Sequence, residues 1–137
     1  MEEARAGPSP KPLNVLVVDD EPDIANLIED VLALSGHRVT KAASGERALE
    51  QLVSKRFDLV LSDMRMPDLD GPGLHARIRA SWPEMLGRIV FITGDAASAE
   101  TLEFFTRTGA RTLAKPFTIG ELQQILAAAC STYSSPN

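Results

Sequence analysis

Short apolar runs alternate along this chain with longer stretches in which apolar residues recur at helical spacing. Three runs rich in valine, leucine and isoleucine occupy residues 14–19, 57–62 and 88–92. Such runs are typical of strands that are buried on both faces of a sheet. Two weaker patterns, over 38–42 and 111–114, predict a strand near a sheet edge and a short final strand.

The stretches between these strands predict amphipathic helices with recognisable ends. Pro22 suits a first helical turn and Gly36 a stop, while Ser44 and Thr118 suit N-caps. A helix over 99–108 is expected to end at Gly109. The positions expected to face the core are Ile24, Leu27, Ile28, Val31 and Leu32 in the first helix, Ala48, Leu49 and Leu52 in the second, Leu74 and Ile78 in the third, and Ile119, Leu122, Ile125 and Leu126 in the last.

Five βα units over residues 13–130 predict a single α/β domain. The expected architecture is a five-stranded parallel sheet with helices on both faces and right-handed crossovers. Residues 1–12 carry Gly7 and three prolines among charged and small residues, so this segment is interpreted as a disordered lead-in or linker. Residues 131–137 are interpreted as a polar tail.

Composition excludes several classes of protein. The chain has 137 residues, a net charge of −5 and a pI near 5.0, which argues against a direct nucleic-acid partner or a polybasic membrane binder. No apolar run approaches a membrane span, and the first residues lack the apolar core of a secretory signal. Cys130 is the only cysteine, so an internal disulfide is impossible. A cytoplasmic protein is therefore expected.

Residues that can do chemistry follow four of the five strands. Asp19 and Asp20 follow the first strand, Asp63 the third, Thr93 the fourth and Lys115 the fifth. Because ligands of open parallel sheets bind at the carboxyl ends of the strands, we expect these side chains to converge on one rim. Any one of the aspartates alone would be better explained as a turn former or a helix cap. Five positions at four strand ends favour a common site.

These residue types together suit phosphoryl transfer. Crowded carboxylates repel one another unless a cation neutralises them, and carboxylate, carbonyl and water oxygens are the ligands of Mg²⁺. An ionised aspartate can attack phosphorus and form an acyl phosphate. The transferred group carries charge on three oxygens, and the cation, Lys115 and the Thr93 hydroxyl would provide one partner for each.

The segments that carry these residues resemble the signature segments of response-regulator receiver domains. The resemblance spans the whole folded unit, with the motifs in the family's order and at its spacing. It implies a flavodoxin-like fold with strand order 2-1-3-4-5. The matching segments are VVDDEP at 17–22, DMRMPDLDG at 63–71, TG at 93–94 and KPF at 115–117.

The resemblance also implies a metal site and a phosphoacceptor. Asp63 would accept the phosphoryl group. Mg²⁺, or Mn²⁺ in its place, would be bound directly by Asp20, Asp63 and the backbone carbonyl of Arg65, and through a water by Asp19. The expected donor is a histidine kinase or a phosphotransfer domain, and the output is a downstream protein or a fused domain. The protein is expected to be a monomer or a weak dimer.

Two further residues have implied roles in a conformational switch. Thr93 would be the switch hydroxyl, and Lys115, followed by a cis bond to Pro116, would pair with Asp63 and then with its phosphate. The chain departs from the family at Thr112, where most receivers carry tyrosine or phenylalanine, so switching through an inward-moving ring is not expected. The segments FFTRTG at 104–109 and GARTLAKPF at 109–117 resemble receivers fused to the C-terminus of hybrid histidine kinases.

Other hypotheses remain beside the phosphorylated switch. A receiver-like interaction module without phosphorylation is the main alternative. A haloacid-dehalogenase-type phosphatase would need an acid where Arg65 stands, so no turnover enzyme is expected. Arg65 and Asp95 are predicted to pair and to tune the acyl-phosphate lifetime, against the alternative that they are two exposed charges of little effect.

Three remaining side chains are given structural roles. His37 and His75 are interpreted as surface residues, so the donor histidine must come from elsewhere. Trp82 is expected to pack near the end of the third helix, away from the rim, and to report poorly on Mg²⁺ binding.

Overall fold

A computed structural model describes residues 12–134 as a parallel five-stranded sheet with the order β3-β2-β4-β5-β6. Numbered along the chain this order is 2-1-3-4-5, which confirms the predicted topology. All four neighbouring strand pairs are parallel. The strands are β2 (Asn14–Val18), β3 (Arg38–Ala42), β4 (Leu59–Asp63), β5 (Ile89–Thr93) and β6 (Arg111–Ala114).

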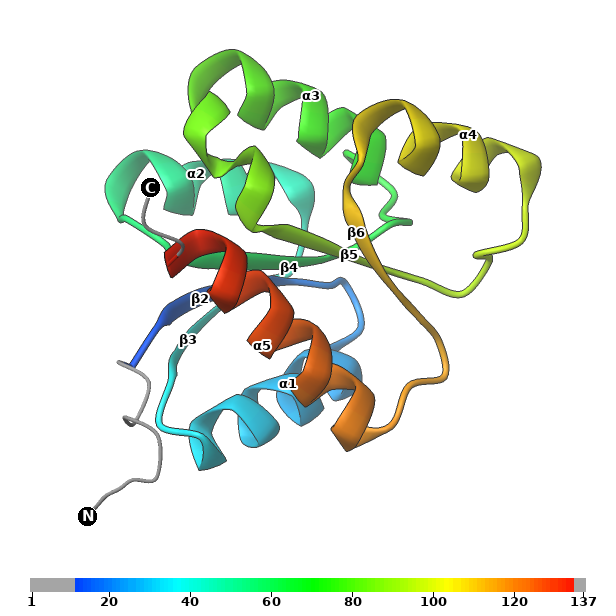
Figure 1. Cartoon of the computed structure of the whole chain (residues 1–137). Helices are drawn as coiled ribbons and strands as arrows, with labels where there is room; N and C mark the ends of the chain where they lie inside the picture. Colours follow the sequence, from blue (N-terminus) through cyan, green and yellow to red (C-terminus); the bar gives the residue numbers. More distant parts are fainter. Residues whose placement is uncertain (1–11, 135–137) are drawn as a thin grey trace.

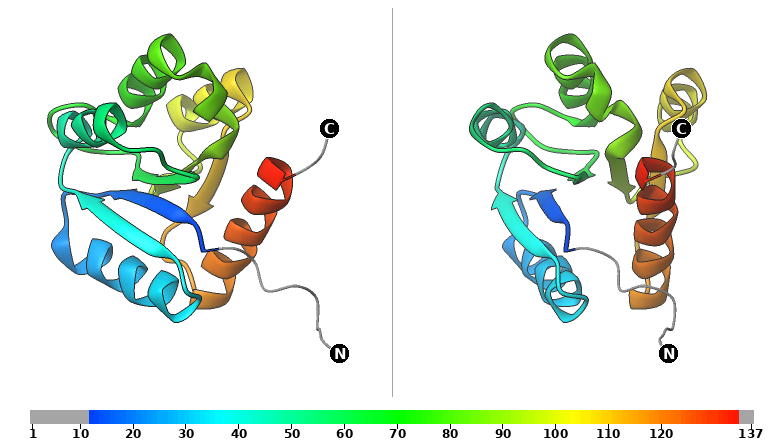
Figure 2. Two further views of the ribbon diagram at one scale, coloured as in Figure 1. Left: turned by 90° about the vertical axis from the view of Figure 1, so that its left-hand side faces the viewer. Right: turned by 60° about the vertical axis from the view of Figure 1, so that its left-hand side comes forward.

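Helices cover both faces of the sheet (Figures 1 and 2). The helices α2 (Gly45–Ser54), α3 (Gly71–Ser81) and α4 (Ala99–Thr108) lie on one face, and α1 (Pro22–Leu34) and α5 (Ile119–Ser134) lie on the other. Successive residues of β2 alternate between the two cores: Leu16 packs with the first group of helices, and Val15 and Val17 with the second. This double burial explains why the central strands are continuous apolar runs.

The predicted helix ends are confirmed. The Ser44 hydroxyl accepts a hydrogen bond from the backbone N–H of Arg47 at 3.1 Å. Thr118 and Glu121 form a reciprocal capping box at the start of α5, because each side chain accepts the other's backbone N–H. Gly109 ends α4 in the left-handed conformation, with φ of 70°. Local sequence therefore determines where these helices begin and end.

The structure differs from the expectations in several details. The last helix continues to Ser134, into the segment interpreted as a polar tail, and no Gly or Pro occurs between Gly120 and Pro136 to stop it. A 3-10 segment, η1 (Pro83–Arg88), precedes β5 and was not predicted. Leu27 and Ile119 are 44% and 54% exposed rather than inward-facing. Residues 1–11 and 135–137 lie outside the described part of the chain.

His75 is also a correction. It is buried rather than at the surface, between α3, β5 and α4. Its ring lies 5.4 Å from the Phe104 ring, nearly perpendicular to it, and 6.2 Å from the Phe91 ring. His37 is half-buried, and its Nδ1 accepts a hydrogen bond from the backbone N–H of Leu13. Neither contact could be read from helical or strand periodicity, because each joins residues distant in the chain.

None of the helices within residues 12–134 combines the length and the apolar character that crossing a membrane requires.

Candidate functional site

The candidate residues converge because parallel strands end on the same side of the sheet. Asp19 directly follows β2, Asp63 ends β4, and Thr93 ends β5. The register aligns Asp63 with Ile92 of β5 and Thr93 with Ala114 of β6, so Lys115 follows at the same rim. The predicted convergence is therefore confirmed.

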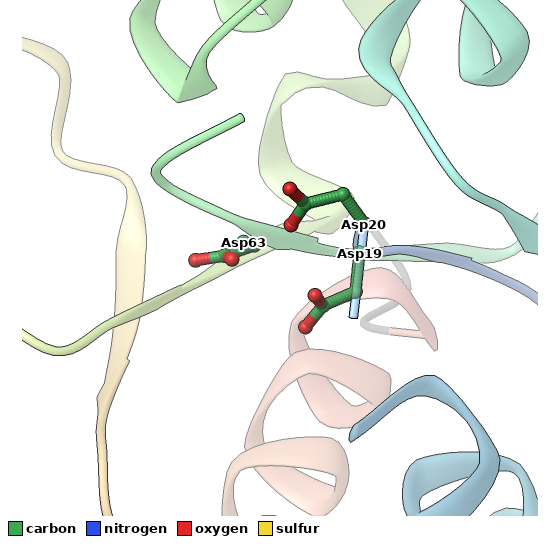
Figure 3. Close-up of side chains that lie close together, drawn as sticks. All are labelled: Asp19, Asp20 and Asp63. Atoms are coloured by element: carbon green, nitrogen blue, oxygen red, sulfur yellow. The ribbon is translucent and has the colours of Figure 1, made fainter. Parts of the chain in front are cut away.

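Three carboxylates form an acidic cluster at this rim (Figure 3). One oxygen from each of Asp19, Asp20 and Asp63 lies within 4.8 Å of the others. Asp19 and Asp63 are only 3% and 6% exposed, whereas Asp20 is open to solvent. Hard oxygen ligands in this arrangement could hold a divalent cation.

Asp19 is incompletely satisfied in this cluster. Its Oδ1 accepts a hydrogen bond from the backbone N–H of Glu21 at 2.9 Å. Its Oδ2 is buried and has no hydrogen-bond partner among the described residues. Burial raises the pKa of Asp19 to about 6, and the charge of Asp63 adds to this rise. An orphaned buried carboxylate oxygen next to other acids fits a site that is completed by a cation and its bound water.

Lys115 brings positive charge to the cluster. Its Nζ lies 3.5 Å from Asp63 Oδ2 and 3.9 Å from Glu21 Oε1. The Lys115–Pro116 bond is cis, as the family resemblance implies. Asp63 also accepts a hydrogen bond from the backbone N–H of Arg65, at 3.4 Å. Glu21 was not predicted as part of this contact, because the sequence gives no indication of which acid its side chain approaches.

Thr93 is buried at the end of β5, and its hydroxyl accepts a hydrogen bond from the backbone N–H of Asp95 at 3.0 Å. The loop after β5 is thus attached to the predicted switch hydroxyl.

Thr112 pairs with Phe91 in the β5–β6 register, and its side chain is exposed. The position at which the family usually has an aromatic ring therefore makes no buried contact here.

Arg65 and Asp95 form the predicted pair at the mouth of the site. Arg65 Nη2 lies 3.1 Å from Asp95 Oδ2, and both side chains are substantially exposed. Both residues line an open cavity of about 520 Å³. Its other lining residues are Asp20, Glu21, Asp63, Gly94 and Lys115. Asp63 and this ion pair therefore share one open cavity.

The loop that follows Asp63 is attached to α2, which the sequence reasoning missed. The Asp68 carboxylate accepts hydrogen bonds from the backbone N–H groups of Gly45 and Glu46, at 3.4 and 3.0 Å. The hydrogen bond from Glu46 is the main reason that the pKa of Asp68 is lowered. A Cβ on Gly45 would lie 2.7 Å from Leu69, so glycine permits this close approach. In the sequence, the one indication of this contact is that Asp68 is an aspartate in a turn-rich stretch.

The sequence model of the response regulator receiver domain matches residues 15–127. The chain belongs to this family. Phosphorylation and Mg²⁺ are typical of such receivers, which interact with histidine kinases or phosphotransfer proteins and with fused output domains.

Named relatives differ in how much of their length this receiver covers. It is 33% identical over 119 residues to the response regulator receiver protein CpdR of Brucella abortus, covering 84% of this chain and 98% of that protein. It is 33% identical over 113 residues to the response regulator protein FleR of Pseudomonas aeruginosa, but covers only 24% of FleR. The chain thus spans about a quarter of this longer relative.

Solved receiver structures have the same fold. The signal receiver domain of an HD domain-containing protein from Pseudomonas fluorescens superposes with a TM-score of 0.82 at 28% identity, covering 92% of this chain and 100% of that one. The receiver domain of a sensor histidine kinase from Pseudomonas aeruginosa superposes with a TM-score of 0.76 at 35% identity, covering 85% of this chain and 96% of that one. That structure has a magnesium ion coordinated in the active-site cleft.

Proposed function

We propose that this receiver accepts a phosphoryl group on Asp63 from a phosphohistidine of a histidine kinase or a phosphotransfer domain. The observation that carries the proposal is the environment of Asp63. Its carboxylate lies beside two further carboxylates and 3.5 Å from the Lys115 ammonium. An aspartate that was only a turn former would not need both an acidic cluster around it and a lysine partner.

The residues around Asp63 suit a Mg²⁺ ion, with Mn²⁺ as a substitute. Asp20, Asp63 and the backbone carbonyl of Arg65 would bind it directly, and Asp19 through a water. The orphaned Oδ2 of Asp19 supports this assignment, as does the magnesium in the kinase receiver with 35% identity. When bound, the cation would neutralise the clustered carboxylates and one oxygen of the transferring group.

The transfer itself uses Asp63 as a nucleophile. A carboxylate oxygen of Asp63 forms a bond to phosphorus while the phosphorus–nitrogen bond of the phosphohistidine breaks, and that electron pair returns to the imidazole nitrogen. Lys115 would hold a second phosphoryl oxygen, and the Thr93 hydroxyl would donate to the third. In the later dephosphorylation, water attacks phosphorus, and the bond to Asp63 breaks to regenerate the carboxylate and inorganic phosphate.

The same groups would form the switch. Turning the Thr93 hydroxyl toward a phosphoryl oxygen would end its hydrogen bond with the Asp95 N–H and release the loop after β5. The output surface would be α4, β6 and α5, without a ring at Thr112. In this role the protein is a cytoplasmic switch that catalyses only its own phosphorylation and dephosphorylation, as a monomer or a weak dimer.

Intact-mass measurement after incubation with Mg²⁺ and acetyl phosphate tests the proposal. We expect one phosphoryl adduct on the unchanged chain and none on an Asp63→Asn variant. An Asp58→Asn variant, which changes an aspartate just before β4, is the matched control and should still form the adduct. The absence of an adduct on the unchanged chain, with both acetyl phosphate and a phosphorylated kinase, would favour the unphosphorylated interaction module.

A further inference from the structure

A second groove lies at the end of the molecule opposite Asp63. It has a volume of about 370 Å³ and is formed where α2 ends and where η1 leads into β5. In Figure 1, α2 and the segment that precedes β5 lie on the same face of the sheet. Phe57 lines the groove just before β4, and Asp63 ends that strand. At about 3.3 Å per residue, the two residues are separated by about 20 Å.

The floor of this groove is apolar. Leu52, Phe57 and Met85 are buried and belong to the core beneath it. Trp82 is half-buried and packs against the same core, which leaves part of its indole open to the groove. Val53 lines the edge of the groove with an apolar side chain and is 77% exposed. A side chain that enters the groove would therefore contact an aromatic ring and an aliphatic edge.

The rim of the groove is positively charged. Lys55, Arg56 and Arg88 line it, against the single acid Glu84. Among the described residues neither Lys55 nor Arg56 has a carboxylate partner, and Lys55 Nζ donates only to the Thr40 hydroxyl, at 3.2 Å. Elsewhere cations such as Lys41 and Arg107 have glutamate partners. Within the described part of the chain, Lys55 and Arg56 thus add positive charge that no carboxylate pairs with at this end of the molecule, although the whole chain has a net charge of −5.

We propose that this groove binds an acidic segment of a partner protein, which places one bulky apolar side chain on Trp82 between the cations of the rim. An apolar centre surrounded by charged residues is the usual anatomy of a protein interface. Tryptophan and arginine are the residue types that most often dominate such contacts. The positive rim selects an acidic partner by charge complementarity. Because Asp63 is far away, the contact leaves the phosphorylation site free.

The single tryptophan of the chain makes the proposal testable by fluorescence. The probe is a blocked peptide, Glu-Glu-Leu-Phe-Glu-Glu, which has no tryptophan of its own. We expect a saturable change in Trp82 emission, weakened by added salt. The double variant Lys55→Glu with Arg56→Glu should bind at least about tenfold more weakly. Arg47→Glu with Arg107→Glu changes the net charge equally on α2 and α4 outside the groove, and should bind within about twofold of the unchanged chain.

Several outcomes separate this proposal from its alternatives. An Asp63→Asn variant should bind the probe as tightly as the unchanged chain, so the result does not depend on the proposed phosphorylation. If the charge-reversed variant fails to give a native circular-dichroism spectrum, Lys55→Gln with Arg56→Gln replaces it. The proposal is overturned if no saturable emission change occurs, or if both charge reversals weaken binding equally. Dimerisation that is lost in the groove variant, without probe binding, would instead assign the groove to a second copy.

Discussion

Lys115 Nζ lies 3.5 Å from Asp63 Oδ2, at the rim where β4 and β6 end on either side of β5. Asp63 is almost fully buried, while Lys115 is partly open to solvent. The lysine thus places a positive charge beside a buried carboxylate. The same charge is available to a phosphoryl group attached to Asp63, which makes this contact the natural place to test the proposed chemistry.

Replacing Lys115 with alanine should slow the formation of the phosphoryl adduct. A hydrogen bond to a charged group contributes about 1.5–3 kcal/mol, so we expect a rate roughly tenfold to a hundredfold lower. Lys41→Ala, which removes a lysine paired with Glu29 outside the cluster, should leave the rate unchanged. The measurement is the time course of intact mass with acetyl phosphate and Mg²⁺. Equal rates in the Lys115 variant and the unchanged chain would remove this lysine from the mechanism.

Arg65 and Asp95 should affect the lifetime of the phosphoryl group. Their ion pair lines the same open cavity as Asp63. Replacing either residue with alanine removes the pair, so water should reach phosphorus more readily and the rate of dephosphorylation should rise by roughly twofold to tenfold. The measurement is the decay of the adduct after acetyl phosphate is removed. Arg107→Ala, which breaks the exposed pair with Glu103 on α4, is the control. An unchanged decay rate in both single variants would leave the pair with no kinetic role.

In the absence of metal, replacing Asp19 with asparagine should stabilise the fold at neutral pH. Because the folded protein holds the Asp19 proton more tightly than the unfolded chain, the stability from this group is present below pH 3.8 and lost as the pH rises through about 6. Asparagine removes the buried charge, so we expect the free energy of unfolding at pH 7 to rise by roughly 1–3 kcal/mol.

Urea unfolding in the presence of a chelator measures this difference, which should shrink as the pH falls toward 4. Adding Mg²⁺ should stabilise the unchanged chain more than the variant, because asparagine brings no charge to the cation. A variant that is less stable than the unchanged chain at pH 7 without metal would contradict the expected cost of burying the charged Asp19 carboxylate.

His75 should make the fold sensitive to mild acid. Its burial lowers the pKa of the imidazole, and the charges of Arg79 and Arg107 lower it further. The folded protein therefore binds this proton less tightly than the unfolded chain, so the stability is fully present above the usual pKa of 6.5 and is lost as the pH falls below it. Replacing His75 with leucine should reduce the dependence of the unfolding free energy on pH between 7 and 5. The same slope in a His75→Leu variant and in the unchanged chain would contradict this.

Trp82 should not report Mg²⁺ binding. It lies in the groove formed by the end of α2 and by η1, whereas the acidic cluster is at the carboxyl ends of the strands. We expect its emission to stay constant over the Mg²⁺ concentrations that raise the melting temperature. A saturable emission change at those concentrations would show that the two ends of the domain are coupled.

The strands, most helix ends and the residues of the rim could be predicted from the sequence alone. Continuous apolar runs predicted β2, β4 and β5 because strands covered on both faces have no polar side to alternate with. Ser44, Thr118 and Gly109 predicted helix ends because capping is a contact between near neighbours in the chain. Asp19, Asp63, Thr93 and Lys115 could be assigned to one rim because parallel strands all end on the same side.

Contacts between side chains from separate elements could not be predicted in this way and are seen in the folded structure alone. Three such contacts join residues far apart in the chain. Asp68 binds the start of α2, Glu21 approaches Lys115, and His75 packs against Phe104. The orphaned oxygen of Asp19 likewise depends on what surrounds it in space. Periodicity gives the face on which a residue lies, but partners, burial and pKa depend on distances that exist only after the elements have packed.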